Sequence, residues 1–368
     1  MRRLRSALLM LPLLMLAACN NTSNDAAPKS SDTASPPAPT ATTPPKAAGP
    51  RLKIGYVLHV QNDFAQVIKR GAEDAGKALD VDVEVVGPQA AVASDAIAMF
   101  EDMVQKKKDG LVVIPMPGDV WVKPIKDATD AGIPVTSANI TSPNSTAAAW
   151  FGQNEYESGV TLAKEMRKLL EADGKKSGTI LVGICATGVE VLDERYKGFK
   201  KGLEGSGFTA TDAKDVGVEK TANYAAWENQ ATKYPDIVAA VGLCSMDIPN
   251  LAKLKASSKA KWLIGGYDLN QETLDAIKAG TTQITLGQHP YLQGYLPVLA
   301  LVQYLRDKKP LPKGWVNVGT EIVTKANVDS VYPRETDHAA ETKWYADHIA
   351  KNFGDLGALA KPLPQTHP

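Results

Sequence analysis

Apolar and polar positions follow two patterns that succeed each other along the chain from residue 51 onward. Short apolar runs rich in Val and Ile, such as 52–58 and 110–114, are typical of strands buried on both faces of a parallel sheet. Between these runs, apolar residues recur at helical spacing, as Val92, Ala96 and Met99 do. The pattern therefore predicts a body in which strands and helices alternate.

The predicted elements divide into two successive sets of about five strands. The strands are predicted at 52–58, 81–86, 110–114, 133–135, 150–152, 179–184, 208–213, 237–243, 262–267 and 283–288. The helices are predicted at 64–79, 92–103, 120–131, 158–170, 191–203, 222–233, 249–255, 271–278 and 291–305. Strand–helix–strand order implies right-handed crossovers, and roughly 300 residues suit two cores better than one. The sequence thus predicts an α/β protein with two doubly wound parallel-sheet lobes.

The N-terminal residues have the pattern of a bacterial lipoprotein signal. Three arginines in the first five residues precede the apolar run 7–16, which is too short to span a bilayer. The run ends in Leu16-Ala17-Ala18-Cys19, which resembles the lipobox. Residues 1–18 are therefore predicted to be a signal peptide, and Cys19 is predicted to carry the lipid. The alternative is ordinary signal cleavage beside an incidental cysteine.

The segment that follows the signal has the composition of a spacer. Residues 19–50 are mostly Asn, Ser, Thr, Ala and Pro, so they cannot bury enough surface to offset their ordering entropy. This segment is predicted to be a disordered tether that holds the globular part away from the membrane. No second apolar run approaches 18 residues, so the sequence predicts no transmembrane helix.

Charge and motif content exclude several classes of function. The 41 Lys and Arg balance the 41 Asp and Glu, and the net charge of +0 argues against a nucleic-acid partner. The sequence has no phosphate-binding loop, no HExxH motif and no Ser-His-Asp order, so we expect no enzyme, no cofactor and no metal site. Besides Cys19 the chain has Cys185 and Cys244, which we expect to be buried free thiols; a disulfide is the alternative in an oxidising compartment.

Polar side chains follow the predicted strands at the points where these strands end. In doubly wound sheets a ligand lies beyond these ends. Amides, carboxylates and a guanidinium can each hold two ligand hydroxyls, and an aromatic ring can cover an apolar sugar face. The candidates are Asn62, Phe64, Asn139, Arg195, Asp247, Asp268 and Gln288.

Four segments resemble the ribose/galactose type of periplasmic binding protein, the type I fold, in the same order along the chain. They are Gly152-Gln153-Asn154, Arg195-Tyr196-Lys197-Gly198-Phe199, Ile264-Gly265-Gly266-Tyr267-Asp268 and Gln288-His289-Pro290-Tyr291-Leu292-Gln293-Gly294-Tyr295. The resemblance covers about residues 51–323. It implies ligand contacts at Asn62, Phe64, Asn139, Arg195, Asp268 and Gln288. Asp247 has a second interpretation, as the cap of the helix near Pro249.

The chain departs from this family at two positions of the ligand site. Ile140 stands where the ribose group has an arginine, and Met246 stands where an asparagine is usual. The loss of two polar groups suggests a ligand with an apolar flank, such as a deoxy or methylated sugar or a cyclitol.

The resemblance also implies the division into lobes, with chain crossings near Gly152, His289 and Gly319. We expect an N-terminal lobe of 51–152 plus 289–318, a C-terminal lobe of 153–288 plus 319–355, and a loose tail of 356–368. The implied function is that of a monomeric periplasmic or cell-surface lipoprotein, which captures a sugar or polyol and delivers it to the permease of an ABC importer. The alternative is a sensory binding protein that presents the ligand to a chemoreceptor or sensor kinase.

The lipobox is tested by Cys19→Ala, which should release the protein from membranes into the soluble exported fraction. Cell fractionation with immunoblotting measures this change. Unchanged membrane association would contradict the lipid anchor.

Overall fold

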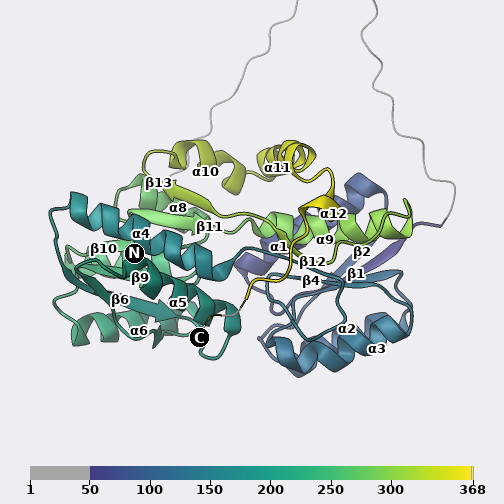
Figure 1. Ribbon diagram of the computed structural model, residues 1–368. Coiled ribbons are helices and arrows are strands. Elements are labelled where there is room, and N and C mark those ends of the chain that lie inside the picture. Colours follow the sequence, from purple (N-terminus) through teal and green to yellow (C-terminus); the bar gives the residue numbers. More distant parts are fainter. Residues whose placement is uncertain (1–49, 366, 368) are drawn as a thin grey trace, which may run out of the picture. The chain divides into compact units, whose positions relative to one another are not determined.

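The computed structural model describes residues 50–365 and 367 and divides them into two α/β lobes (Figure 1). The predicted signal peptide, Cys19 and nearly all of the predicted tether lie outside these described residues. None of the helices in the described part combines the length and the apolar character that crossing a membrane requires.

The sheet of the N-terminal lobe has six strands that are all parallel. They are β1 (Lys53–Val57), β2 (Asp82–Val86), β3 (Gly110–Val113), β4 (Val135–Ala138), β5 (Ala149–Gly152) and β12 (Gly314–Asn317), in the order β12-β5-β4-β3-β1-β2. The strands β3, β4 and β5 are buried at every position, because helices cover both faces of the sheet. The apolar runs predicted β1 to β5, whereas β12 was not predicted.

The sheet of the C-terminal lobe repeats this arrangement with one antiparallel strand. Its strands are β6 (Gly178–Ile184), β7 (Phe208–Ala210), β8 (Lys214–Asp215), β9 (Ala239–Gly242), β10 (Leu263–Tyr267), β11 (Ile284–Gly287) and β13 (Glu321–Thr324), in the order β13-β11-β10-β9-β6-β7 with β8 beside β6. Only β13 runs antiparallel to its neighbour among these described strands. The prediction of two parallel-sheet lobes is therefore confirmed.

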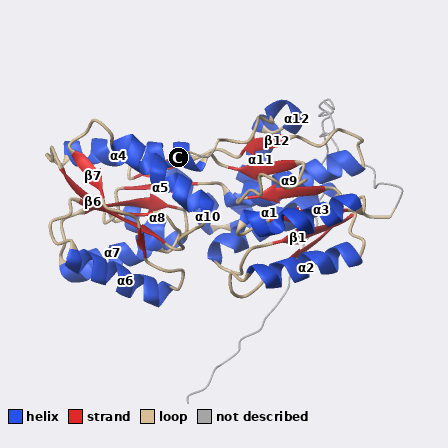
Figure 2. Cartoon of the chain, turned by 60° about the horizontal axis from the view of Figure 1, so that its bottom comes forward, coloured by secondary structure: helices blue, strands red, loops and turns tan. Residues whose placement is uncertain are grey.

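Helices cover both faces of each sheet, as Figure 2 shows. In the N-terminal lobe, α1 (Asp63–Leu79) and α9 (Pro290–Leu305) pack on one face, and α2 (Ala93–Gln105), η1 (Gly118–Trp121) and α3 (Val122–Asp130) on the other. In the C-terminal lobe, α4 (Glu155–Ala172) and α5 (Glu190–Leu203) share one face, and α6 (Lys220–Lys233), α7 (Asp247–Ser258) and α8 (Gln271–Lys278) lie on the other side. Each lobe therefore has a core on each face of its sheet.

The chain passes between the lobes at three places. The strands on either side of Gly152, His289 and Gly319 belong to different sheets. All three passages begin where a parallel strand ends, after β5, β11 and β12. The passages are therefore at the same edges of the sheets as the polar residues that follow the other strands.

The C-terminal helices differ from the predicted division into lobes. The helix α10 (Val328–Thr336) packs with α8 and β13 of the C-terminal lobe. The helix α11 (His338–Asn352) instead places Tyr345 and Ile349 in a core cluster with α9, β5 and β12 of the N-terminal lobe. Assigning all of 319–355 to the C-terminal lobe was therefore wrong for α11, because its apolar face completes the core over β12, a strand that the sequence did not reveal.

The predicted loose tail also makes specific contacts. Within it, α12 (Leu356–Leu359) buries Leu356, and Lys361 exchanges two backbone hydrogen bonds with Trp315 at 2.7 and 2.8 Å. Further along, His367 stacks on Tyr156 with 3.5 Å between ring centroids, and its backbone N–H donates to Glu194. The described part of the tail therefore contacts both lobes.

The two cysteines of the C-terminal lobe form a disulfide, so the prediction of free thiols was wrong. Cys185 and Cys244 are 59 residues apart, and their Cα atoms are separated by 6.0 Å. The neighbouring strands β6 and β9 pair with the same 59-residue offset, up to Gly183 opposite Gly242. Both cysteines come two residues after this ladder ends, where the backbone is free to adopt the geometry that a bridge requires.

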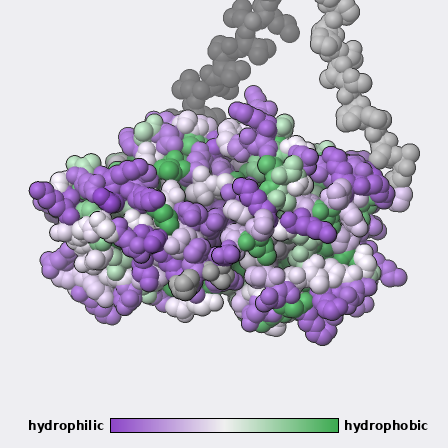
Figure 3. All heavy atoms as spheres, in the orientation of Figure 1, coloured by the Kyte–Doolittle hydropathy of each residue, from purple (hydrophilic) through white to green (hydrophobic). Residues whose placement is uncertain are grey.

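The surface on the side shown in Figure 3 is mixed in character. Hydrophilic side chains spread over both lobes on this side, and hydrophobic ones form small scattered groups. Large exposed apolar side chains such as Val92, Val120 and Tyr304 belong to different elements or loops.

The disulfide is expected to stabilise the fold mainly by lowering the conformational entropy of the unfolded chain. For a loop of 59 residues the chain-entropy relation gives about 4 kcal/mol. The double variant Cys185→Ala/Cys244→Ala should therefore lower the free energy of unfolding by several kcal/mol, measured by urea denaturation. Intact-mass analysis of the wild type before and after reduction is the control, because a wild type with two titratable thiols would contradict the bridge.

Candidate functional site

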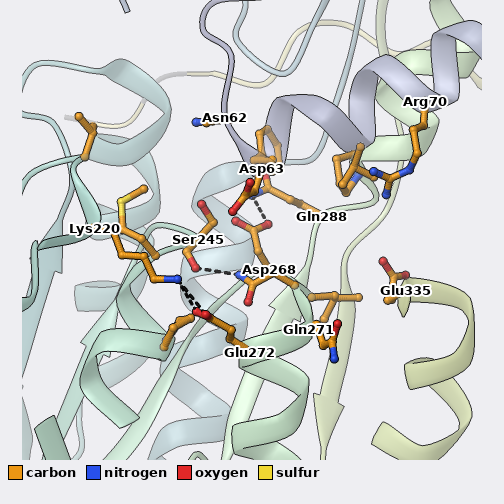
Figure 4. A pocket seen from close by; sticks show the side chains of 18 residues that line it. Asn62, Asp63, Arg70, Lys220, Ser245, Asp268, Gln271, Glu272, Gln288 and Glu335 are labelled. Carbon is orange, nitrogen blue, oxygen red and sulfur yellow. Dashed lines mark hydrogen bonds and ion pairs between the residues drawn. The ribbon is translucent and has the colours of Figure 1, made fainter. Parts of the chain in front are cut away.

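A cavity of about 490 Å³ lies between the lobes, at the carboxyl ends of the strands (Figure 4). The N-terminal lobe contributes the start of α1, and the C-terminal lobe contributes the residues after β9 and β10. The lining residues are Asn62, Asp63, Phe64, Val67, Arg70, Val218, Lys220, Ser245, Met246, Pro249, Asp268, Leu269, Asn270, Gln271, Glu272, Gln288, Pro290 and Glu335. This is the position where doubly wound sheets bind ligands.

Four of the seven predicted ligand residues line this cavity: Asn62, Phe64, Asp268 and Gln288. The side chain of Asn62 also caps α1, since its Oδ1 accepts a hydrogen bond from the Ala65 backbone N–H at 2.8 Å. Phe64 follows in the first turn of that helix and brings an aromatic ring to the cavity. The site therefore combines an aromatic surface with amide and carboxylate groups.

Asp268 is held on the cavity wall by its backbone and by Gln288. It follows β10 directly, with a φ of 74° that aspartate tolerates better than most residues. Its Oδ1 accepts a hydrogen bond from Gln288 Nε2 at 2.8 Å, which Figure 4 shows as a dashed line. Asn270, and not Asp268, caps the helix α8 that follows. The carboxylate of Asp268 is therefore free of a capping role.

Burial controls the ionisation of Asp268. Its side chain is 7% exposed, and this burial raises its pKa to about 6, although the hydrogen bond from Gln288 and the charge of Arg195 act in the opposite direction. Glu335, a lining residue on α10, has a pKa raised to about 7, again chiefly by burial. The cavity wall thus contains carboxyl groups that exchange protons near neutral pH.

Arg195 lies outside the cavity lining and is 3% exposed. It makes an ion pair with Glu155, with 2.6 Å between Nη2 and Oε2, and its Nη1 donates to the Leu243 carbonyl at 2.6 Å. Its guanidinium also lies 4.0 Å from the centre of the Tyr267 ring. The guanidinium therefore lies outside the set of residues that line the cavity, and its ion-pair partner is 40 residues earlier in the chain.

Asn139 and Asp247 also lie outside the cavity lining. Asn139 has a φ of 59°, and its Nδ2 donates to Gln293 Oε1 at 3.0 Å. Asp247 is fully buried and accepts hydrogen bonds from Asn223, Trp227 and the Cys244 backbone N–H. Burial raises the pKa of Asp247 to about 6. Asp247 thus orders the loop after β9, which presents Ser245 and Met246 to the cavity.

Several charged lining residues were not among the predicted candidates. Lys220 pairs with Glu272 at 2.8 Å, and Arg70 pairs with Glu341 at 2.8 Å. These residues lie on helices, where a sequence pattern shows only a polar face. Asp63 and Ser245 could have been found, because each stands beside a strand end or a helix start, whereas Met246 had already been placed at the ligand site as a departure from the family pattern. Within the described residues, no group of His, Cys, Asp and Glu has the arrangement of a metal site.

Comparison with known proteins identifies a sequence family and a common fold. The family described as "Periplasmic binding protein domain" matches residues 54–309. A xylose/arabinose-binding protein of Sulfolobus acidocaldarius is 26% identical over 303 residues, which cover 76% of this chain and 72% of that protein. A ribose import binding protein of Bacillus subtilis is 24% identical, over 69% of this chain and 81% of the relative.

A solved structure has the same fold. The solute-binding protein of an ABC transporter from Burkholderia graminis, in complex with D-arabinose, aligns with a TM-score of 0.72 and 24% identity. The alignment covers 76% of this chain and 97% of that one.

Asp268→Asn should stabilise the ligand-free protein at neutral pH. The raised pKa means that the folded protein favours the protonated carboxyl of Asp268. The contribution of this group to the free energy of unfolding is therefore fully present below pH 4 and is lost as the pH rises through about 6. Asparagine tolerates the same backbone and avoids the buried charge, so the variant should gain up to about 3 kcal/mol above pH 6. Melting temperatures from pH 4.5 to 8 measure this: the gain should grow with pH, and a gain independent of pH would contradict the titration of Asp268.

Proposed function

This chain belongs to the periplasmic binding protein domain family, and from that premise we propose that it binds a neutral sugar or polyol in the cavity between its lobes and delivers it to the permease of an ABC importer. The observation that carries this proposal is the cavity wall itself. It combines the Phe64 ring with the amides of Asn62 and Gln288 and the carboxylate of Asp268. Such groups bind hydroxyls with fixed geometry beside an apolar ring face.

The charges of the lining favour an uncharged ligand. Arg70 is ion-paired with Glu341, and Lys220 is ion-paired with Glu272. A ligand carboxylate or phosphate would therefore have to compete with protein carboxylates for both cations. Relatives named for binding xylose, arabinose and ribose support a pentose or a molecule of similar size.

The lining on one side of the cavity supports a ligand that has an apolar flank. Met246 lines the cavity, with Pro249 and Val218 on the same lobe. Ile140, the other departure from the ribose-binding pattern, is 4% exposed and belongs to the core of the N-terminal lobe. A deoxy or methylated sugar, or a cyclitol, would place its apolar side against Met246.

Binding is expected to close the two lobes. The lining comes from both lobes, and three chain passages connect them, so a ligand that contacts both walls binds the closed arrangement better than the open one. Delivery to a permease would then depend on recognition of the closed arrangement. The proposed lipid on Cys19 would keep the protein at the membrane outside the cytoplasm, near that permease.

The sensory alternative uses the same cavity and differs in the partner of the closed protein. Deletion of the cognate permease should abolish ligand uptake while leaving any ligand-dependent transcription intact. If deletion of this protein abolishes ligand uptake, the result supports delivery to an importer. If the deletion abolishes only the ligand-dependent transcription, the result supports the sensory role.

A thermal-shift panel of pentoses, deoxy sugars and cyclitols should identify a ligand, because binding to the native state raises the melting temperature.

Asp268→Ala should then weaken the binding of that ligand by about 2–5 kcal/mol, or tens-fold to several thousand-fold, measured by calorimetry. Solution scattering of the wild type should show a smaller radius of gyration when the ligand is added. For the affinity measurement, Asp102→Ala, at an exposed helix position, is the matched control. Equal affinity of Asp268→Ala and wild type would contradict the proposed site.

A further inference from the structure

One carboxyl group of the cavity lining comes from beyond the part of the chain that the family match covers. The match ends at residue 309, and the helix α10 begins at Val328. Among the described residues that line the cavity, only Glu335 of α10 comes after residue 309. The segment of α10 and α11 therefore adds a group to the cavity that the matched domain does not supply.

The segment that carries this carboxyl group is anchored on both lobes. On α10, the Tyr332 hydroxyl donates to Asp275 Oδ1 of the C-terminal lobe at 2.8 Å. On α11, the Glu341 carboxylate accepts two hydrogen bonds from Arg70 of the N-terminal lobe, at 2.8 and 3.0 Å. Asp337 alone separates the two helices, so this segment joins the lobes in addition to the three passages between the sheets. The end of α10 is therefore held relative to both walls of the cavity.

The neighbouring Arg334 orients the carboxyl group of Glu335. Its Nε donates to Glu335 Oε1 at 2.8 Å. Arg334 is in turn ion-paired with Glu321 of β13, and its guanidinium lies 4.0 Å from the centre of the Trp344 ring on α11. Because an ion pair and an aromatic ring both hold the guanidinium, Arg334 fixes Glu335 in one orientation.

The second oxygen of this carboxyl group is available to a ligand. Within the described residues, Glu335 Oε2 has no hydrogen-bond partner, although the side chain is only 8% exposed. The burial that raises the pKa of Glu335 to about 7 also shows that the group is poorly hydrated. A polar atom in such a place is costly without a partner, and a hydroxyl group in the cavity would provide one.

Arg70 supplies donors at the same end of the cavity. The hydrogen bond to Glu341 raises the pKa of Arg70 most, and the charge of Glu335 adds to this effect, so both carboxyl groups lie near the guanidinium. Glu341 accepts from two of the five N–H groups of Arg70, which leaves other N–H groups for a ligand. A carboxyl and a guanidinium side by side can hold one hydroxyl as acceptor and donor.

The two ends of the cavity differ in character. Figure 4 shows Glu335 and Arg70 at one end and Ser245 at the other, with Asp268 between them. Met246 follows Ser245 in the chain and gives that end its apolar surface. A ligand with an apolar flank against Met246 would therefore direct its opposite side towards Glu335.

We propose that Glu335 is a ligand-binding residue that accepts a hydrogen bond from a hydroxyl of the sugar or cyclitol, at the end of the cavity opposite Met246. Arg334 is then a positioning residue, because it orients Glu335 without lining the cavity. The ligand class is thereby narrowed to molecules whose apolar side and hydroxyl lie at opposite ends. This inference rests on ligand binding in the cavity, which is the function proposed above.

The first test measures affinity for the compound that gives the largest thermal shift in the panel. Glu335→Ala should weaken binding roughly 10- to 100-fold, because it removes a hydrogen bond to a charged group. Glu335→Gln keeps an acceptor for Arg334 and for the ligand, so it should fold and weaken binding less. The matched control is Asp329→Ala on the same helix, whose exposed side chain pairs with Lys278 and should not affect affinity.

Deoxy analogues of this compound, each lacking one hydroxyl, separate a ligand contact from a structural role. The loss of affinity caused by Glu335→Ala should largely disappear for the analogue that lacks the bound hydroxyl, and should persist for the others. Arg334→Lys keeps the charge but not the planar fork, and its loss should disappear for the same analogue. A loss that is equal for every analogue would mean that Glu335 serves only as a partner of Arg334, and would overturn the proposal.

The same measurements distinguish this inference from the proposed function. A wild type that binds a sugar or cyclitol no more tightly than Glu335→Ala does would overturn the contact at Glu335 and leave the proposed function intact. If Glu335→Ala does not fold, as judged by its melting curve, Glu335→Gln takes its place, and wild-type affinity of that variant for the ligand and for every analogue would overturn the contact. A wild type that binds no compound of the panel would overturn the proposed function, and the contact with it.

Discussion

Parallel strands end at one edge of a sheet, and this constraint places both the cavity and the passages between the lobes. The strands are covered on both faces, so most of their own positions are apolar, and the larger polar and charged groups gather after the strand ends. The residues after β9 and β10 line the cavity, and the passages leave after β5, β11 and β12. Gln288, the residue after β11, can therefore belong to the cavity wall and to a passage at once.

Concentrating polar groups at this edge puts charges into a poorly hydrated region. Burial raises the pKa of Glu155 even though Arg195 is its ion-pair partner, so desolvation outweighs the attraction. Asp247 and Asp268 have pKa values near 6 for the same reason. A cavity wall of this kind lowers the stability of the fold, and hydrogen bonds from Gln288, Asn223 and Trp227 offset part of this loss.

The sequence predicted the elements that have a strong local pattern. Strands such as β3 and β9 are unbroken apolar runs, and the polar residues that follow each strand identified Asp268 and Gln288 without tertiary information. β12 and α11 were not predicted, because β12 buries only Trp315 and Val316 and α11 buries little more than Glu341, Tyr345 and Ile349 along fifteen residues. Contacts between residues far apart in the sequence could not be predicted either. The ion-pair partner of Arg195 is on another helix, and the disulfide depends on the register of two strands.

The two walls of the cavity are built differently, and this difference bears on how a ligand is selected. In the C-terminal lobe, Asp268 is connected to Gln288, Arg195 and Glu155, so contacts within the protein orient these polar groups. The N-terminal lobe contributes the first turn of α1, in which Asn62 is fixed as a cap and Phe64 offers a ring. Preorganised donors and acceptors distinguish the hydroxyl pattern of a ligand at little entropic cost, whereas an aromatic ring accepts many apolar faces. Under the proposed function, selectivity should therefore come mainly from the C-terminal wall, and the N-terminal wall should add affinity as the lobes close.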